Sequence, residues 1–422
     1  MGLYINILFF LMFLGFSYWY AKKSFTLFFL YGLVFFQAFA ILPSLIYIEE
    51  GILINEQGRF SFYTGATILC VLYFIFTFMV IAMSFKSFNK IKLPTFQLAY
   101  KGKNVDKHLI LATLVIVQFL LLVNAALSPL PFFDDSVDRF SYWSSSRFPF
   151  LKTIFGNTAM FIPFGWGLLF PKYKKTAIGM FFVYLGYNFL IGQKFSPIVN
   201  GSFSFLLPIV FYYKNNLFNI LKKNIVSLGL IGICLFGIMY TVTYNKYKKT
   251  RPFANIEIYD PNQAMLYRIF GLQGHLFWGA TERYVVGETE AKSFNPTELI
   301  LGMRVMMHEF AADQGVLLSN EESGFNFTNA YPAILFKIFP LSVALIFHTF
   351  FTIGFLAVMG WVLKEFLNHR ALILSLIAYQ LFLWTLYAFS MGYFNKLYIP
   401  VAFLLVYAIF VYLRNPKYVP QH

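Results

Sequence analysis

Residues 267–278 read YRIFGLQGHLFW, and they lie at the centre of the one long polar segment of this chain, residues 244–331. A basic stretch, KYKKTRP, precedes them and ends at Arg251-Pro252, and a second charged cluster follows at 304–309. Outside this segment the chain consists mainly of apolar runs. The sequence therefore predicts polar chemistry held between membrane-spanning parts of the chain.

The composition is that of a membrane protein. Of 422 residues, 59% are hydrophobic and 12% are charged, and the mean hydropathy is +0.65. A soluble domain carries about 25% charged residues. An apolar run of about 17–25 residues is long enough to cross a bilayer as a helix. The first run has no cleavage-like site before Lys22-Lys23, so we expect a retained span rather than a signal peptide.

The runs predict an all-α polytopic protein with about eleven transmembrane helices. The expected spans are 3–20, 25–48, 63–84, 108–128, 152–170, 176–192, 199–213, 225–243, 341–363, 372–390 and 398–413. The short links on alternate sides carry 18 and 7 lysines and arginines, and the richer set is expected in the cytoplasm. We therefore predict helices in 1–243, an outward-facing helical loop at 244–331 that caps the active site, and further helices in 332–422.

The net charge and the cysteines give no indication of a nucleic-acid-binding protein or of a disulfide-stabilised one. A net charge of +15 follows from this topology and does not indicate a nucleic-acid partner. Cys70 and Cys234 lie inside apolar runs, where cysteine behaves as a small hydrophobic residue. Three aspartates at 134, 135 and 138 fit a salt-bridge cluster with Arg139, a site acid or a divalent ion, but their spacing matches no known metal loop. We expect no metal and no cofactor.

Within the polar segment, residues 261–286 and 296–318 are predicted to be helices on the outer surface. Each begins with proline after a good N-cap residue, Asp260 or Asn295. Arg268 and His275 are seven residues apart and would share one helix face that binds a pyrophosphate or a sugar. The alternative is an interfacial helix whose arginine reaches lipid headgroups. Gln273 and Trp278 lie on another side of the same helix.

Arg304, His308 and Glu309 form a second predicted constellation. Arg304 and His308 are neighbours at helical spacing, and Glu309 can pair with Arg304 from the adjacent side. Histidine and glutamate are the usual proton acceptors in transfer chemistry. The alternative is an ion pair on a helix surface.

Further candidates lie in the outward loops. Lys194, in a turn of a few residues, binds phosphate or extends to the membrane interface, and the same alternatives hold for Arg139. Residues 322–331 offer Asn326 and Thr328 as sugar hydrogen-bonders, or form an ordinary loop.

Residues 268–278, with the pattern RI-x-x-LQG-x-x-x-W, and 322–332, ESGFNFTNAYP, resemble the Wzy family of O-antigen polymerases. The resemblance extends to the whole architecture, with about a dozen spans, short cytoplasmic links and an outward loop near the end of the chain. It implies an inverting, metal-independent glycosyltransferase of the GT-C-like type in the bacterial inner membrane. Such an enzyme joins repeat units carried on undecaprenyl pyrophosphate at the periplasmic face, in lipopolysaccharide synthesis, with a chain-length regulator protein as a further partner.

The implied chemistry assigns roles to these residues. Cations that stabilise the leaving pyrophosphate are the largest expected catalytic contribution, and the acceptor hydroxyl needs a base. Arg268 lies in the matching motif, whereas Arg304 and Lys194 are assigned by position, and we expect these three to converge on one cavity. The full set for pyrophosphate is Arg268, Arg304, Lys194, Arg251 and Arg139; for sugar it is Gln273, Trp278, Asn326 and Thr328; for catalysis it is His275, His308, Glu309 and Glu322.

Two other functions remain open. A ligase that moves finished polymer onto lipid A core would have similar architecture and chemistry. A flippase for lipid-linked oligosaccharide would show repeat-related halves and charges near the bilayer midplane. The predicted spans are nearly free of ionisable residues, which favours surface chemistry over transport.

Overall fold

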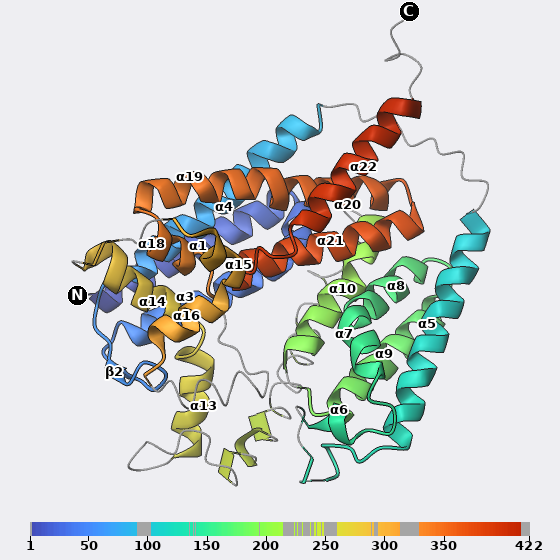
Figure 1. The fold of residues 1–422 in the computed structure, drawn as a ribbon, viewed down its shortest axis with the longest axis horizontal. Helices are drawn as coiled ribbons and strands as arrows, with labels where there is room; N and C mark the ends of the chain where they lie inside the picture. The colour runs from blue at the N-terminus through green and yellow to red at the C-terminus, as the bar shows by residue number, and fades with distance from the viewer. Residues whose placement is uncertain are drawn as a thin grey trace, which may run out of the picture.

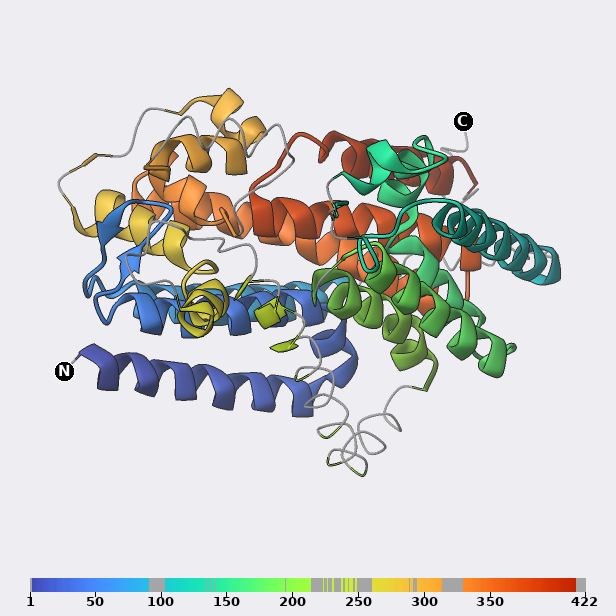
Figure 2. The same cartoon turned by 90° about the horizontal axis from the view of Figure 1, so that it is seen from below.

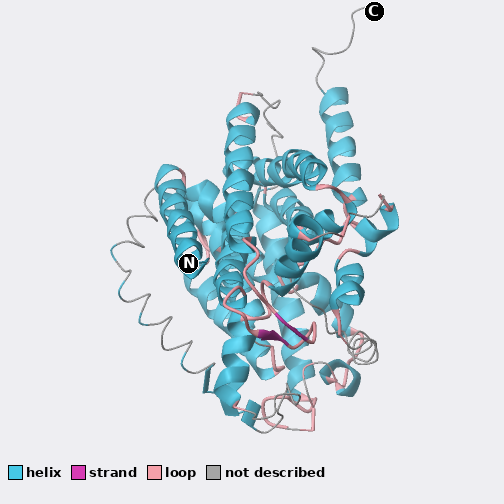
Figure 3. Cartoon of the chain, turned by 90° about the vertical axis from the view of Figure 1, so that its left-hand side faces the viewer, coloured by secondary structure: helices cyan, strands magenta, loops and turns pink. Residues whose placement is uncertain are grey.

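The computed structural model describes residues 2–90, 103–213 except 135, 138, 140 and 194, scattered positions in 223–248, 260–312 except 288 and 291–293, and 329–414. Helices dominate these residues, and one two-stranded hairpin accompanies them (Figure 1, Figure 3). The described part of the chain is therefore mostly helical, as predicted, although the hairpin was not expected.

The first part of the chain forms a layer of long helices and the hairpin. α1 packs against α4 and α3, and Figure 2 shows α1 along one side of the molecule. Leu53 pairs with Phe60, and Ile54 with Arg59, in the antiparallel hairpin between α3 and α4. The elements are α1 (Gly2–Lys23), α2 (Phe25–Leu30), α3 (Gly32–Ile48), β1 (Leu53–Ile54), β2 (Arg59–Phe60) and α4 (Ala66–Phe88).

A second group of helices lies beside this layer. α8 packs against both α9 and α10. Gly167 permits the close approach to α10, because a Cβ at this position would collide with the carbonyl oxygen of Phe205. The helices are α5 (Lys103–Ala126), α6 (Tyr142–Ser145), α7 (Leu151–Thr158), α8 (Phe161–Leu169), α9 (Lys174–Leu190) and α10 (Phe195–Tyr213).

The described helices of the polar segment lie at one end of the molecule, together with the β1–β2 hairpin (Figure 2). Its elements, with the short helix that follows, are α13 (Pro261–Phe270), α14 (His275–Ala280), the π-helix η1 (Thr281–Val286), α15 (Pro296–Leu301), α16 (Met303–Phe310) and α18 (Ala333–Ile338). The chain then returns through α19 (Leu341–Phe351), the π-helix η2 (Thr352–Ala357), α20 (Val358–Asn368), α21 (Leu372–Met391) and α22 (Tyr398–Arg414).

Five helices in the described part of the chain are long and apolar enough to cross a membrane. They are Gly2–Lys23, Ala66–Phe88, Asp106–Ala126, Leu341–Asn368 and Leu372–Met391. Shorter apolar helices cover Gly32–Ile48 and Pro197–Tyr213. The protein therefore has the helices of a membrane protein, while the predicted number of eleven spans is not confirmed. The predicted span at 225–243 is described only at scattered positions.

The prediction of two long helices in the polar segment is wrong, because each is interrupted by a turn. Gly271 and Gly274 form a turn between α13 and α14, and Ser44 fixes it by accepting from the Gly274 amide at 2.8 Å and donating to the Gly271 carbonyl at 3.3 Å. Gly302, with φ +50°, separates α15 from α16, and residues 313–318 lie outside the described part. The predicted N-caps are confirmed: Asp260 and Asn295 each accept a backbone N–H at 3.0 Å.

Glu49 fixes the junction between the hairpin and α4. Its carboxylate is 5% exposed and accepts from the amides of Ala66 and Thr67 at 2.8 and 3.2 Å, and from Asn6 Nδ2 at 2.9 Å. The hydroxyls of Thr64 and Thr67 donate to it as well. A negative charge at a helix N-terminus is favoured by the unpaired amides and the helix dipole. The hairpin is thereby held at the end where the polar segment lies.

Candidate functional site

The clearest site is a groove on α16. Arg304, His308 and Glu309 line a cavity of about 440 Å³ together with Leu301 and Val305. The opposite face of α16 is buried through Met303, Met306, Met307 and Phe310. The amphipathic helix therefore presents the predicted cation, imidazole and carboxylate on one surface, and the helical spacing of Arg304 and His308 is confirmed.

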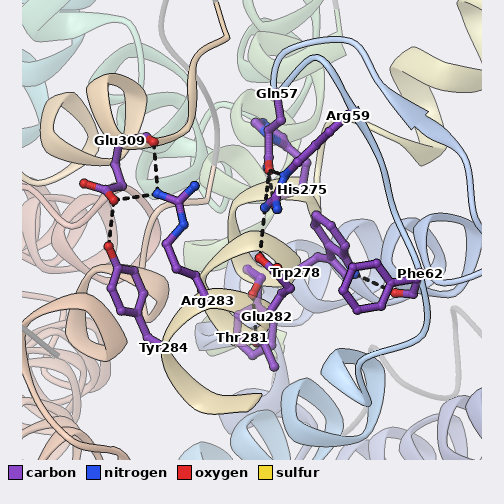
Figure 4. Close-up of polar contacts among 11 residues, drawn as sticks. Gln57, Arg59, Phe62, His275, Trp278, Thr281, Glu282, Arg283, Tyr284 and Glu309 are labelled. Atoms are coloured by element: carbon purple, nitrogen blue, oxygen red, sulfur yellow. Dashed lines mark hydrogen bonds and ion pairs between the residues drawn. The ribbon is translucent and has the colours of Figure 1, made fainter. Parts of the chain in front are cut away.

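Glu309 is held by groups from other elements. Its Oε1 accepts from Arg283 Nη1 at 2.6 Å and from the Tyr284 hydroxyl at 2.8 Å (Figure 4). Lys337, 2% exposed on α18, places its Nζ 3.9 Å from Glu309 Oε2 and 2.9 Å from Glu298 Oε2. Burial and the neighbouring Glu309 raise the pKa of Tyr284, so this hydroxyl stays protonated even well above neutral pH. The Glu309 carboxylate thus joins η1, α16 and α18.

Two arginines act electrostatically on Tyr247, and they form a second cation cluster. This side chain is 2% exposed and packs against Ala264 and Met265 of α13. The Arg268 guanidinium lies 5.9 Å from the centre of the Tyr247 ring. Burial raises the pKa of Tyr247, while Arg268 and Arg139 oppose that shift. Two predicted pyrophosphate ligands from distant segments, Arg268 and Arg139, therefore act on one hydroxyl group.

Both arginines have neighbours that position them. Arg139 lies beside Gly192, whose φ of +74° forms the turn just before Lys194. The Tyr267 hydroxyl donates to Glu56 Oε2 and accepts from the Asn55 amide at 3.0 Å, which ties α13 to the hairpin. Burial raises the pKa of Glu56, and the Tyr267 hydrogen bond and the charge of Arg268 oppose this shift. The charge of Arg268 thus acts on both a carboxyl group and a phenol.

His275 and Trp278 lie inside the fold. His275 is buried on α14; its Nδ1 is 3.3 Å from Gln57 Nε2, which also donates to the His275 carbonyl at 2.9 Å (Figure 4). Burial lowers the pKa of His275 to about 3, so the ring is neutral at physiological pH. Trp278 Nε1 donates to the Phe62 carbonyl at 2.9 Å. These contacts hold the hairpin, and the expected shared face of Arg268 and His275 is wrong because the turn at 271–274 separates them.

Some of the remaining candidates lie in the described part of the chain, and the others lie outside it. Gln273 Oε1 accepts from Asn329 Nδ2 at 3.1 Å, which joins the centre of the polar segment to its C-terminal end. Asp134 accepts from the amide and hydroxyl of Ser136, and these hydrogen bonds lower its pKa within an exposed local turn. The predicted residues Lys194, Arg251, Glu322, Asn326 and Thr328 lie outside the described part of the chain. The convergence of Arg268, Arg304 and Lys194 on one cavity stays a prediction.

Sequence reasoning missed several residues of these clusters. Tyr247, Arg283, Tyr284 and Lys337 were assigned no role, although each contacts a predicted site residue. The sequence feature that could have identified Lys337 is its position alone within an apolar run, because lysine is almost never fully buried without a partner. Lys337 lies between Ile334-Leu335-Phe336 and Ile338-Phe339.

Comparison with known proteins gives one match. A family described as a family of unknown function (DUF6418) matches residues 296–406, about a quarter of the chain. No curated protein and no solved structure matches this chain. The matched region runs from α15 into α22 and includes Arg304, His308, Glu309 and Lys337. The fold and the clusters define a helical membrane protein with a polar cap, and the family match assigns it no activity.

Proposed function

We propose that the protein is a membrane glycosyltransferase that polymerises oligosaccharide repeat units linked to undecaprenyl pyrophosphate. The reaction takes place at the periplasmic face of the bacterial inner membrane. The observation that carries this proposal is the α16 groove, where a cation, an imidazole and a carboxylate line one cavity of about 440 Å³. Glycosyl transfer from a pyrophosphate needs a positive group for the leaving oxygens and a proton acceptor for the attacking hydroxyl.

The groove residues divide the chemistry. The acceptor hydroxyl oxygen forms a bond to the anomeric carbon while the bond from that carbon to the pyrophosphate oxygen breaks, which inverts the configuration. Arg304 stabilises the departing lipid pyrophosphate anion, since a guanidinium binds phosphate oxygens through two parallel hydrogen bonds. His308 takes the hydroxyl proton, because Glu309 Oε1 is already engaged by Arg283 and Tyr284. Glu309 therefore acts as a positioning residue for α16.

The second cation cluster supports a polymerase in particular. A polymerase joins two substrates that each carry a lipid pyrophosphate, so it needs positive charge in two places. Arg268 and Arg139 supply the second set beside Tyr247. We assign the growing chain, which leaves its carrier, to the α16 groove, and the pyrophosphate of the incoming unit to Arg268 and Arg139.

The test is restoration of polymer in a strain that carries the matching polysaccharide gene cluster but lacks its polymerase. The wild-type protein restores a ladder of surface polysaccharide on a gel, whereas Arg304→Ala and His308→Ala leave only the single-repeat band. The matched control is Arg370→Ala, which removes a guanidinium that lies 4.8 Å over the Tyr212 ring, in a link expected on the cytoplasmic side. A wild-type protein that yields no ladder overturns the proposal.

A second strain, which makes polymer but lacks its ligase, distinguishes a polymerase from a ligase. A polymerase leaves the polymer on its carrier lipid in that strain. Attachment of the polymer to lipid A core by the wild-type protein would overturn the polymerase assignment in favour of the ligase.

A further inference from the structure

A cavity of about 170 Å³ lies between the helix bundle and the polar segment. It is formed by α3, α10 and α21 together with the residues at 160, 273 and 329. Among the described residues that line it, none is charged. The polar ones are Gln37, Asn200, Gln273, Asn329, Tyr387 and Ser390, and apolar side chains such as Leu33, Leu383 and Leu386 complete the wall.

Gln37 is the residue that calls for a ligand. It lies on the largely apolar helix α3 and is 9% exposed, and its buried Nε2 has no hydrogen-bond partner among the residues that the structure describes. Buried polar groups are nearly always paired, and an unpaired one reduces the stability of the fold. An amide N–H of this kind, on the wall of a cavity, is suited to donate to an oxygen atom that enters it.

The rim of the cavity is fixed in place. Asn329 adopts a left-handed backbone conformation with φ +62°, which asparagine tolerates better than most residues. Its Nδ2 donates to the Gln273 carbonyl at 3.2 Å and to Gln273 Oε1 at 3.1 Å. Gln273 in turn belongs to the turn that Ser44 of α3 holds through Gly271 and Gly274. The amides therefore keep their positions without a ligand.

We propose that this cavity binds one uncharged sugar ring of a membrane amphiphile. Amide and hydroxyl side chains match the hydroxyls of a sugar, and the apolar walls match its C–H face and the adjoining alkyl chain. The absence of charge in the described lining makes it unsuited to a phosphate, in contrast to the clusters around Arg268 and Arg304. The volume is below the range of about 300–1,000 Å³ typical of drug-sized ligands, so it suits a single ring rather than an oligosaccharide.

The inference rests on the proposed function where it names the source of this sugar. Under that function the ring belongs to the lipid-linked repeat unit, and its position sets which unit the enzyme accepts. The other source of the same chemistry is a neutral polyol headgroup of a bilayer lipid. Competition experiments separate the two sources.

The test uses the full chain in nanodiscs of phosphatidylethanolamine and phosphatidylglycerol, with an alkyl glucoside that carries a photoreactive diazirine in its chain. Peptides of α3 and α21 are labelled and identified by mass spectrometry. The expected result is labelling that an excess of unmodified alkyl glucoside abolishes. The same diazirine chain ending in a simple alcohol should label these peptides at least tenfold less.

Two variants make the result specific. Gln37→Leu should weaken competition by the glucoside about tenfold, the effect of one lost hydrogen bond of about 1.4 kcal/mol. It should be at least as stable to heat as the wild type, because the substitution removes an unpaired buried amide. Arg304→Ala is the control and should leave labelling unchanged. Equal labelling by glucoside and alcohol, an inert Gln37→Leu, or a lower melting temperature of Gln37→Leu would each overturn the sugar site.

The competitors identify the source. The purified lipid-linked repeat unit should compete with the probe at lower concentrations than a neutral glycosyl diacylglycerol. Competition by the glycosyl diacylglycerol alone would overturn the assignment of the ring to the repeat unit. Failure of the polysaccharide ladder with intact Gln37-dependent labelling rejects the polymerase and keeps the sugar site. A normal ladder without specific labelling rejects the sugar site and keeps the polymerase.

Discussion

Replacement of Arg268 by lysine or alanine distinguishes a ligand of the substrate from a cation that only anchors a helix at the membrane. In the structure its guanidinium lies 5.9 Å from the centre of the Tyr247 ring, and its positive charge opposes the rise in the pKa of Glu56 that burial causes. A cation–π contact at a partly exposed site contributes about 0.5–1 kcal/mol. Arg268→Ala should therefore lower the stability of the fold by no more than about this amount.

The expected effect on activity is much larger. The pyrophosphate of the incoming unit stays intact in the reaction, so Arg268 contributes by binding it. Loss of one hydrogen-bonded charged partner costs about 1.5–3 kcal/mol, which lowers the rate at subsaturating substrate by about 10- to 150-fold. Arg268→Lys should regain only part of this loss, because an ammonium lacks the planar fork that binds phosphate oxygens in pairs. An arginine that only reaches the membrane interface would be replaced by lysine without loss, since both side chains extend to the headgroups.

The assay is the rate of polymer formation from lipid-linked repeat units, at protein levels matched by immunoblotting of membranes. Arg370→Lys is the control, because Arg370 also lies over a tyrosine ring, at 4.8 Å from that of Tyr212. It should retain wild-type activity. An Arg268→Lys protein with full activity would refute the assignment of Arg268 to the pyrophosphate.

Three further predictions follow from other parts of the molecule. Reporter fusions after Lys103 and after Lys292 should report opposite sides of the membrane, and a common side would contradict the topology inferred from the link charges. Glu49→Ala should lower the free energy of unfolding by about 1–3 kcal/mol or more, because it leaves the α4 amides and Asn6 unpaired, and a thermal melt in detergent that matches wild type would contradict this. His275 has a folded pKa of about 3 against about 6.5 when unfolded, so below pH 6.5 only the unfolded chain takes up its proton and stability falls by up to about 1.4 kcal/mol per pH unit. His275→Gln should lose that part of the dependence between pH 6 and pH 4 in denaturation experiments, and an unchanged slope would show that His275 titrates in the folded protein.

Local features of the sequence were predictable. Asp260 and Asn295 cap their helices as expected, because capping depends only on the next two or three residues. The face shared by Arg304 and His308 follows from helical periodicity within a single turn. The apolar runs likewise determine helices of membrane-spanning length, whatever their number.

Contacts between distant segments could not be predicted from the sequence. Nothing near Gly271 indicates that Ser44, more than two hundred residues earlier, stabilises a turn there instead of a continuous helix. Nothing near Gln37 indicates that it faces a cavity closed by Gln273 and Asn329.

By itself, then, the sequence determined a helical, membrane-embedded chain with polar chemistry concentrated in one segment, because hydropathy and periodicity act between near neighbours. Only the tertiary structure decided which of those polar residues share a surface. It buried His275 and Trp278, left Arg304 and His308 exposed, and joined Glu309 to Arg283 and Lys337. The physical reason is that burial and charge pairing depend on how distant helices pack, and a local pattern carries no record of that packing.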